Sequence, residues 1–173
     1  MANKLIGYVS LFIILILLQS VVFNQICLFN IAVPYVFIFF IFRLPININL
    51  NLLFLLSFLL GFSVDIFSDT LGMNALACTL IAAIRKPVYS LFTPKDDDND
   101  IIIPSIKKMG YSTYILYAGS LSFIYCCLIN VIQAFSFFDV IMLILRSVAS
   151  SILTIIIIFA IESLISSGSE KRL

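Results

Sequence analysis

The sequence predicts an all-α integral membrane protein, a single domain built as a bundle of six transmembrane helices. Of its 173 residues, 62% are hydrophobic and 11% are charged, and the mean hydropathy is +1.19. A soluble domain has roughly 45–50% apolar and about 25% charged residues. The apolar residues also form continuous runs of about 20, the length at which a helix crosses a bilayer. A transmembrane barrel would instead alternate apolar and polar residues. These observations exclude a soluble enzyme and a disordered chain.

The predicted spans cover residues 5–23, 26–42, 50–67, 72–91, 109–132 and 137–165. The first run is longer than the apolar core of a usual signal peptide and no small-x-small site follows it, so we expect it to be retained. The second is short and contains Pro34. The third follows a polar stretch, and Pro87 weakens the end of the fourth. The fifth is continuous, and the sixth is long enough to tilt.

The distribution of basic residues predicts the orientation. If the N-terminus is cytoplasmic, the segments on that side carry nine basic residues: Lys4, Arg43, Arg85, Lys86, Lys95, Lys107, Lys108, Lys171 and Arg172. The outer segments, 24–30, 68–71 and 133–136, carry none. Because cytoplasmic loops are enriched in Lys and Arg, we expect both termini to be cytoplasmic. Residues 93–108 then form a cytoplasmic polar loop. Its acidic run lacks the ligand spacing and the glycine of a calcium loop, which favours a solvated segment.

Charged residues inside a span are costly and have structural or functional roles, and two of them stand out. They are Asp65 in the third span and Arg146 in the sixth. Their predicted depths are similar, so we expect them to pair within the bundle. Asp139, seven residues before Arg146, competes for the same partner. The alternative is that Asp65 caps the end of its helix and meets water. Three tyrosines near the inner end of the fifth span, Tyr111, Tyr114 and Tyr117, predict an interfacial belt.

No catalytic set is apparent, and we expect no enzyme activity and no cofactor. Histidine is absent, and the cysteines form no CxxC motif, which argues against a metal site. Residues 61–69 read G-x3-D-x3-D, half of a motif found in enzymes that transfer phospho-alcohols from CDP-lipids. The other half would occupy residues 47–52, which contain no acidic residue. Basic and acidic residues number 10 and 9, so the chain has no net field to attract nucleic acid.

Residues 61–84, GFSVDIFSDTLGMNALACTLIAAI, resemble the most characteristic block of the MreD family. The matching positions are Gly61, Asp65, Leu71, Gly72 and Ala75. Upstream, residues 29–45 are similar to the family's proline-containing second helix, with Pro34 and Pro45 in place. Tyr35 departs from the pattern, because the family often has an acidic or amide residue there. Arg146, followed by small residues, fits the family's last helix.

The resemblance implies a multi-spanning component of the bacterial inner membrane without catalytic activity. Such proteins belong to the rod, or elongation, complex and associate with MreC, with MreB filaments and with the glycosyltransferase RodA and its partner transpeptidase. The implied function is a scaffold that supports lateral peptidoglycan synthesis and rod shape. The implied fold is similar to the six-helix substrate-binding subunits of energy-coupling-factor transporters, a likeness that does not transfer function. The candidate structural or partner-contact residues are Pro34, Gly61, Asp65, Gly72 and Arg146.

Two other functions remain open. The first is a small-molecule-binding subunit of a transporter, which needs a polar pocket between helices. Its candidate lining residues are Asp65, Asn74, Thr79, Asn130, Arg146 and Thr154. The second is a pore, which the lack of a continuous polar stripe along any span disfavours. In every case membrane lipid is an expected partner.

Overall fold

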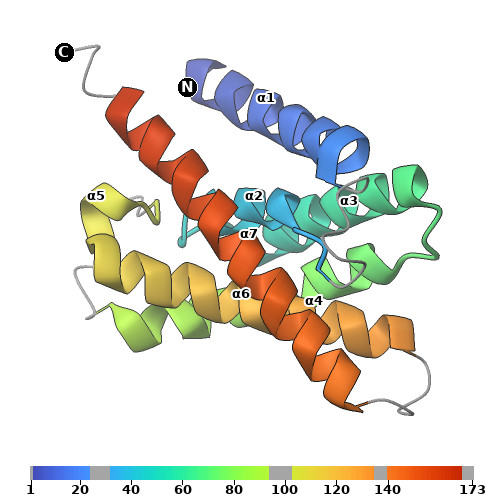
Figure 1. Cartoon of the computed structure of the whole chain (residues 1–173). Coiled ribbons are helices and arrows are strands. Elements are labelled where there is room, and N and C mark those ends of the chain that lie inside the picture. The colour runs from blue at the N-terminus through green and yellow to red at the C-terminus, as the bar shows by residue number, and fades with distance from the viewer. Residues whose placement is uncertain (1, 24–31, 94–102, 135–139, 169–173) are drawn as a thin grey trace.

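The computed structural model describes residues 2–23, 32–93, 103–134 and 140–168, and these are helical almost throughout (Figure 1). Five helices in the described part are long and apolar enough to cross a membrane. The elements that contain them are α1 (Ala2–Leu18), extended by a π-helix, η1 (Gln19–Phe23), then α3 (Leu50–Ser68), α4 (Met73–Phe92), α6 (Tyr111–Ala134) and α7 (Val140–Gly168). The chain is therefore a multi-pass membrane protein.

The second predicted span does not form a continuous helix. Residues 26–31 lie outside the described residues, and the backbone at 33–35 is irregular. A single 3-10 turn, η2 (Val36–Ile38), and a short helix, α2 (Phe39–Arg43), follow. The prediction of a helix over residues 26–42 is therefore wrong for 32–35. The reason is Pro34, which has no N–H to donate and biases the preceding residue towards an extended conformation.

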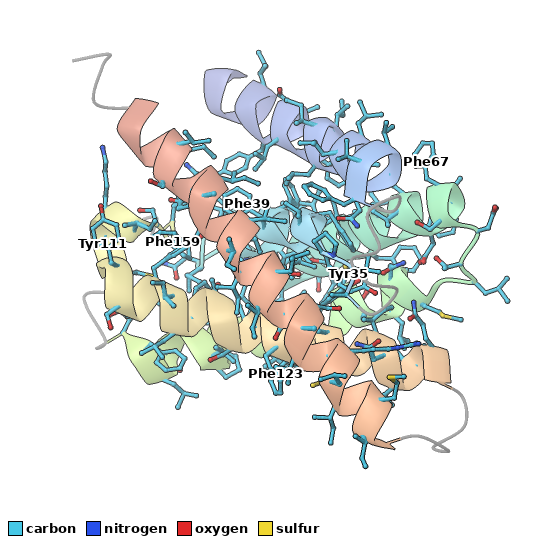
Figure 2. The ribbon with its side chains drawn as sticks, viewed as in Figure 1. Tyr35, Phe39, Phe67, Tyr111, Phe123 and Phe159 are labelled. Atoms are coloured by element: carbon cyan, nitrogen blue, oxygen red, sulfur yellow. The ribbon has the colours of Figure 1, made fainter. Side chains whose placement is uncertain are left out.

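The segment from residue 32 to 45, here called the buried segment, lies inside the bundle. Every residue of its stretch from Val36 to Phe42 is at most 2% exposed. In Figure 2, Tyr35 and Phe39 lie between the surrounding helices. This stretch, VFIFFIF, is apolar on all sides, which is the pattern of a helix enclosed by others. Irregular backbone at membrane depth is tolerated only where protein encloses it.

The buried segment also extends along the length of the bundle. Val33 bonds to Ser150 of α7, and Arg43 pairs with Glu162 of the same helix. From Ser150 to Glu162 α7 advances twelve residues, about 18 Å at 1.5 Å per residue. The segment thus covers much of the apolar depth without being a spanning helix. The start of α1 and the end of α7 lie at the same end of the bundle (Figure 1).

The helix of the fifth predicted span begins at Tyr111, two residues later than expected. In the polar loop, residues 94–102 lie outside the described residues, and α5 (Ile106–Met109) precedes α6. The prediction of an interfacial tyrosine belt is wrong for Tyr114 and Tyr117, which are buried, whereas Tyr111 is exposed. Tyr117 packs edge-on against Phe42 of the buried segment, with ring centroids 6.1 Å apart. The rings therefore fill the space around the buried segment instead of facing the membrane surface.

Helices α3 and α4 form a hairpin with a very close contact. A Cβ atom added at Gly61 would lie 2.5 Å from the Cα of Ala75 and 2.5 Å from the carbonyl oxygen of Asn74. Both neighbours are backbone atoms, which a side-chain rotation cannot move. Only glycine permits this approach, the same device by which small residues bring membrane helices together.

We predict that Gly61→Ala destabilises the bundle by about 1–3 kcal/mol, because α3 and α4 must separate to admit the methyl group. Gly119→Ala is the matched control, since a Cβ there would meet only Ile155 Cδ1 at 3.6 Å, an ordinary contact. Denaturant titration of both variants in detergent measures the difference. Equal stability of the two variants would contradict the close contact.

Candidate functional site

The turn between α3 and α4 is organised by the carboxylate of Asp65, which is 3% exposed. Its Oδ1 accepts hydrogen bonds from the backbone N–H of Asn74 at 3.1 Å and from the Asn74 side-chain amide at 2.9 Å. The Thr70 hydroxyl also donates to Oδ1. Oδ2 accepts from the backbone N–H of Ala75 at 2.9 Å. We call these residues, Asp65, Thr70, Asn74 and Ala75, together with Tyr125, the Asp65 cluster.

The Asp65 cluster caps one helix with a side chain from its neighbour. Gly72, the N-cap residue of α4, makes no side-chain cap, so Asp65 of α3 accepts from the free N–H groups instead. The positive end of the α4 dipole favours the negative charge there. Tyr125 of α6 donates its hydroxyl to Asn74 Oδ1 at 2.6 Å, which joins a third helix to the cluster.

The expected pair of Asp65 and Arg146 is wrong. The Arg146 side chain is exposed, and the ion pair found among the described residues joins Arg43 to Glu162. The physical reason is that N–H and O–H donors of the α3–α4 turn already surround the Asp65 carboxylate. The alternative, in which Asp65 caps the end of its own helix and meets water, is correct only in part. Asp65 does cap a helix, but that helix is α4, and the carboxylate is buried. Asp139, the competing partner, lies outside the described residues.

The structure brings Gly61, Asp65 and Gly72 together at this one turn. Gly72 has a φ of +74°, in the left-handed region that glycine adopts without strain. The same turn leaves Leu71 almost fully exposed, at 95%. Pro34 lies elsewhere, at the start of the buried segment, and Arg146 lies on the outer face of α7.

The first end of the buried segment is held by side chains. Gln19 donates its amide to the carbonyl of Pro34 and accepts from the N–H of Val36, both at 3.0 Å. The N–H of Tyr35 donates to the Thr154 hydroxyl at 3.0 Å, and that of Val33 to the Ser150 hydroxyl at 3.1 Å. Groups that the irregular backbone leaves free are thus bonded by side chains of η1 and α7.

The second end of the buried segment is held by Arg85 of α4, whose side chain is 1% exposed. Its guanidinium donates to the carbonyls of Ile41 and Leu44 at 2.7 Å, and also to that of Pro45. These are carbonyls at and beyond the end of α2, where a cation matches the negative end of the helix dipole. The neighbouring Arg43 pairs with Glu162 of α7, which is also buried.

Sequence reasoning missed Gln19, Arg85 and Glu162. It placed Arg85 with the cytoplasmic loop and gave Glu162 no particular role. The signal for Arg85 was its spacing, because it follows Cys78 and Ala82 at intervals of four and three on the buried face of α4. Glu162 shows the same signal, because Thr154, Ile158 and Glu162 are buried at intervals of four. Gln19 likewise follows the buried Leu15 and Ile16 at intervals of four and three. The spacing does not identify the partner of either side chain, which is distant in the sequence.

Within the described part of the chain, no three or more metal-ligating side chains lie together. One of the four cysteines, Cys27, lies outside that part. Comparison with known proteins finds no matching family model, no matching curated protein and no matching solved structure. The resemblance to the MreD family therefore stays a hypothesis.

We predict that Asp65→Asn destabilises the bundle by about 2–3 kcal/mol, since hydrogen bonds to a charged acceptor are lost and an amide N–H₂ faces backbone donors. Asp69→Asn is the matched control. Asp69 is exposed and has a φ of +52°, a conformation that Asn adopts readily. Thermal unfolding in detergent separates the two variants. A loss of stability for Asp69→Asn as large as that for Asp65→Asn would count against the cluster.

We predict that Arg85→Met destabilises the bundle by about 2–4 kcal/mol, because the carbonyls of Ile41 and Leu44 lose the guanidinium as donor. The adjacent Lys86 is exposed, so Lys86→Met should change stability by no more than about 0.5 kcal/mol. Denaturant titration in one detergent gives both values. If Arg85→Met were as stable as Lys86→Met, the guanidinium would not be what holds the segment.

Proposed function

We propose that this chain is a non-catalytic scaffold of the MreD type in the bacterial inner membrane, with both termini cytoplasmic. It would support lateral peptidoglycan synthesis through MreC, and through MreB, RodA and the partner transpeptidase in the same rod complex. One observation carries the proposal. The residues on which the resemblance rests, Gly61, Asp65, Leu71, Gly72 and Ala75, form a single rigid hairpin whose tip exposes an apolar side chain.

Each of these residues has a distinct role in that hairpin. Gly61 allows close contact with Ala75, Asp65 caps α4, and Gly72 provides the turn. Leu71 has no such internal role and is 95% exposed, so it is available to a partner. A bitopic partner such as MreC has residues on both sides of the membrane, so part of it can contact this hairpin tip.

A specific observation also favours the alternative of a small-molecule-binding transporter subunit. The buried segment is discontinuous, and broken helices often form the substrate sites of transporters. Yet the hydroxyls of Ser150 and Thr154 and the amide of Gln19 already bond to backbone groups of that segment. A ligand there would have to displace these bonds, which makes the scaffold the better-supported proposal.

The test is a mild-detergent pull-down of the tagged chain from native membranes, followed by mass spectrometry. We expect an MreC-like protein, and about tenfold less of it with Leu71→Ser, because an apolar anchor at an interface contributes about 1–2 kcal/mol or more. Leu91→Ser is the matched control, since Leu91 is 77% exposed near the opposite end of the hairpin.

Three outcomes would count against the proposal. Equal recovery of the MreC-like protein with Leu71→Ser and with Leu91→Ser would show that the hairpin tip is not the contact. Recovery of no wall-synthesis protein would contradict the scaffold itself. Recovery of paired ATPases with a coupling subunit, or of a small molecule that remains bound to the purified chain, would favour the transporter alternative.

A further inference from the structure

Arg146 is a charged residue on the membrane-facing side of α7. It lies within the apolar stretch Ile141–Ile165, and its side chain is exposed. Its neighbours on the helix surface are also exposed and are apolar: Met142 at 45% and Leu145 at 52%. A guanidinium in hydrocarbon is costly, so in a bilayer this side chain needs an anion or access to the membrane surface.

None of the described acidic residues, Asp65, Asp69 and Glu162, forms an ion pair with Arg146. Asp65 is enclosed by donors of its own cluster. Glu162 is paired with Arg43, and it lies sixteen residues further along α7, about 24 Å at 1.5 Å per residue. The other described cations of the bundle, Arg43 and Arg85 among them, belong to that distant end. Within the described part of the chain, Arg146 therefore forms no ion pair; Asp139 lies outside that part.

The geometry of α7 directs Arg146 towards the nearer membrane surface. It lies five residues after Ile141, the first residue of the apolar stretch in the described part of α7, which is about 7.5 Å along the helix. Side chains on a helix tilt towards its N-terminus, and here the N-terminus is the nearer end. The long apolar stem of arginine can lie along the helix surface while the guanidinium reaches the headgroup level.

We propose that Arg146 binds the phosphate of an anionic phospholipid at the surface of α7. A guanidinium suits this ligand because two parallel N–H groups match two phosphate oxygens. A partner helix fits less well, because the exposed surface beside Arg146 carries bulky Leu145 and Val148. The small residues that would permit close helix approach, such as Ser147 and Ser150, are buried inside the bundle. This proposal does not rest on the scaffold function.

The test is native mass spectrometry of the full-length protein in detergent, titrated with phosphatidylglycerol. Losing a charge-assisted hydrogen bond of about 1.4 kcal/mol or more weakens binding at least tenfold, so Arg146→Gln should weaken the tightest lipid by about tenfold. Arg146→Lys should retain part of the affinity. Lys107→Gln, which removes an exposed charge on α5, is the matched control and should leave it unchanged. Added inorganic phosphate should not displace the lipid.

Because Arg146 is exposed, Arg146→Gln should unfold at the same temperature as the parent protein, which separates lost lipid from lost fold. Equal lipid affinity of Arg146→Gln and the parent would overturn the proposal, and so would an equal loss with Lys107→Gln. A photo-crosslinker placed at Leu145 in native membranes should yield a lipid adduct. A protein adduct instead would assign this surface to a partner helix.

Discussion

The structure depends on one constraint: irregular backbone cannot stand in the membrane interior unless its polar groups are bonded within the protein. Pro34 makes part of the chain between α1 and α3 irregular, and no water is available at that depth. Gln19, Thr154 and Arg85 converge on this segment from three different elements. The apolar rings of the segment then fill the centre of the bundle, and the surrounding helices enclose it.

The same constraint explains where charge is tolerated. Asp65 lies at the N-terminal end of α4, and Arg85 at the C-terminal end of α2. Each charge has the sign that the nearby helix dipole favours, and each bonds to backbone groups that the helix itself cannot pair. Neither charge needs the other. This is why Asp65 and Arg85 can both lie in one bundle without forming an ion pair with each other.

The sequence predicted the five long helices because apolar length alone determines which segments can cross a bilayer. It failed for residues 32–35, because an enclosed irregular segment is as apolar as a spanning helix and only Pro34 marked the difference. The sequence placed Asp65 and Arg146 within long apolar helices, but it could not predict the direction in which each side chain faces. That direction depends on which helices pack together: Ser147 and Ser150 face inwards and leave Arg146 outside. Glu162 was missed because its partner Arg43 is 119 positions away.

Rigidity links the Asp65 cluster to the proposed role as a scaffold. Gly61 fixes the distance between α3 and α4, Asp65 fixes the start of α4, and Tyr125 ties the turn to α6. Leu71 is therefore presented on a turn with little freedom left to lose. Binding to such a surface avoids much of the entropy cost of ordering a flexible loop, so a small contact area can contribute usefully to affinity. For a protein built mainly of apolar helices, a preorganised hairpin tip therefore provides a surface on which a partner can bind.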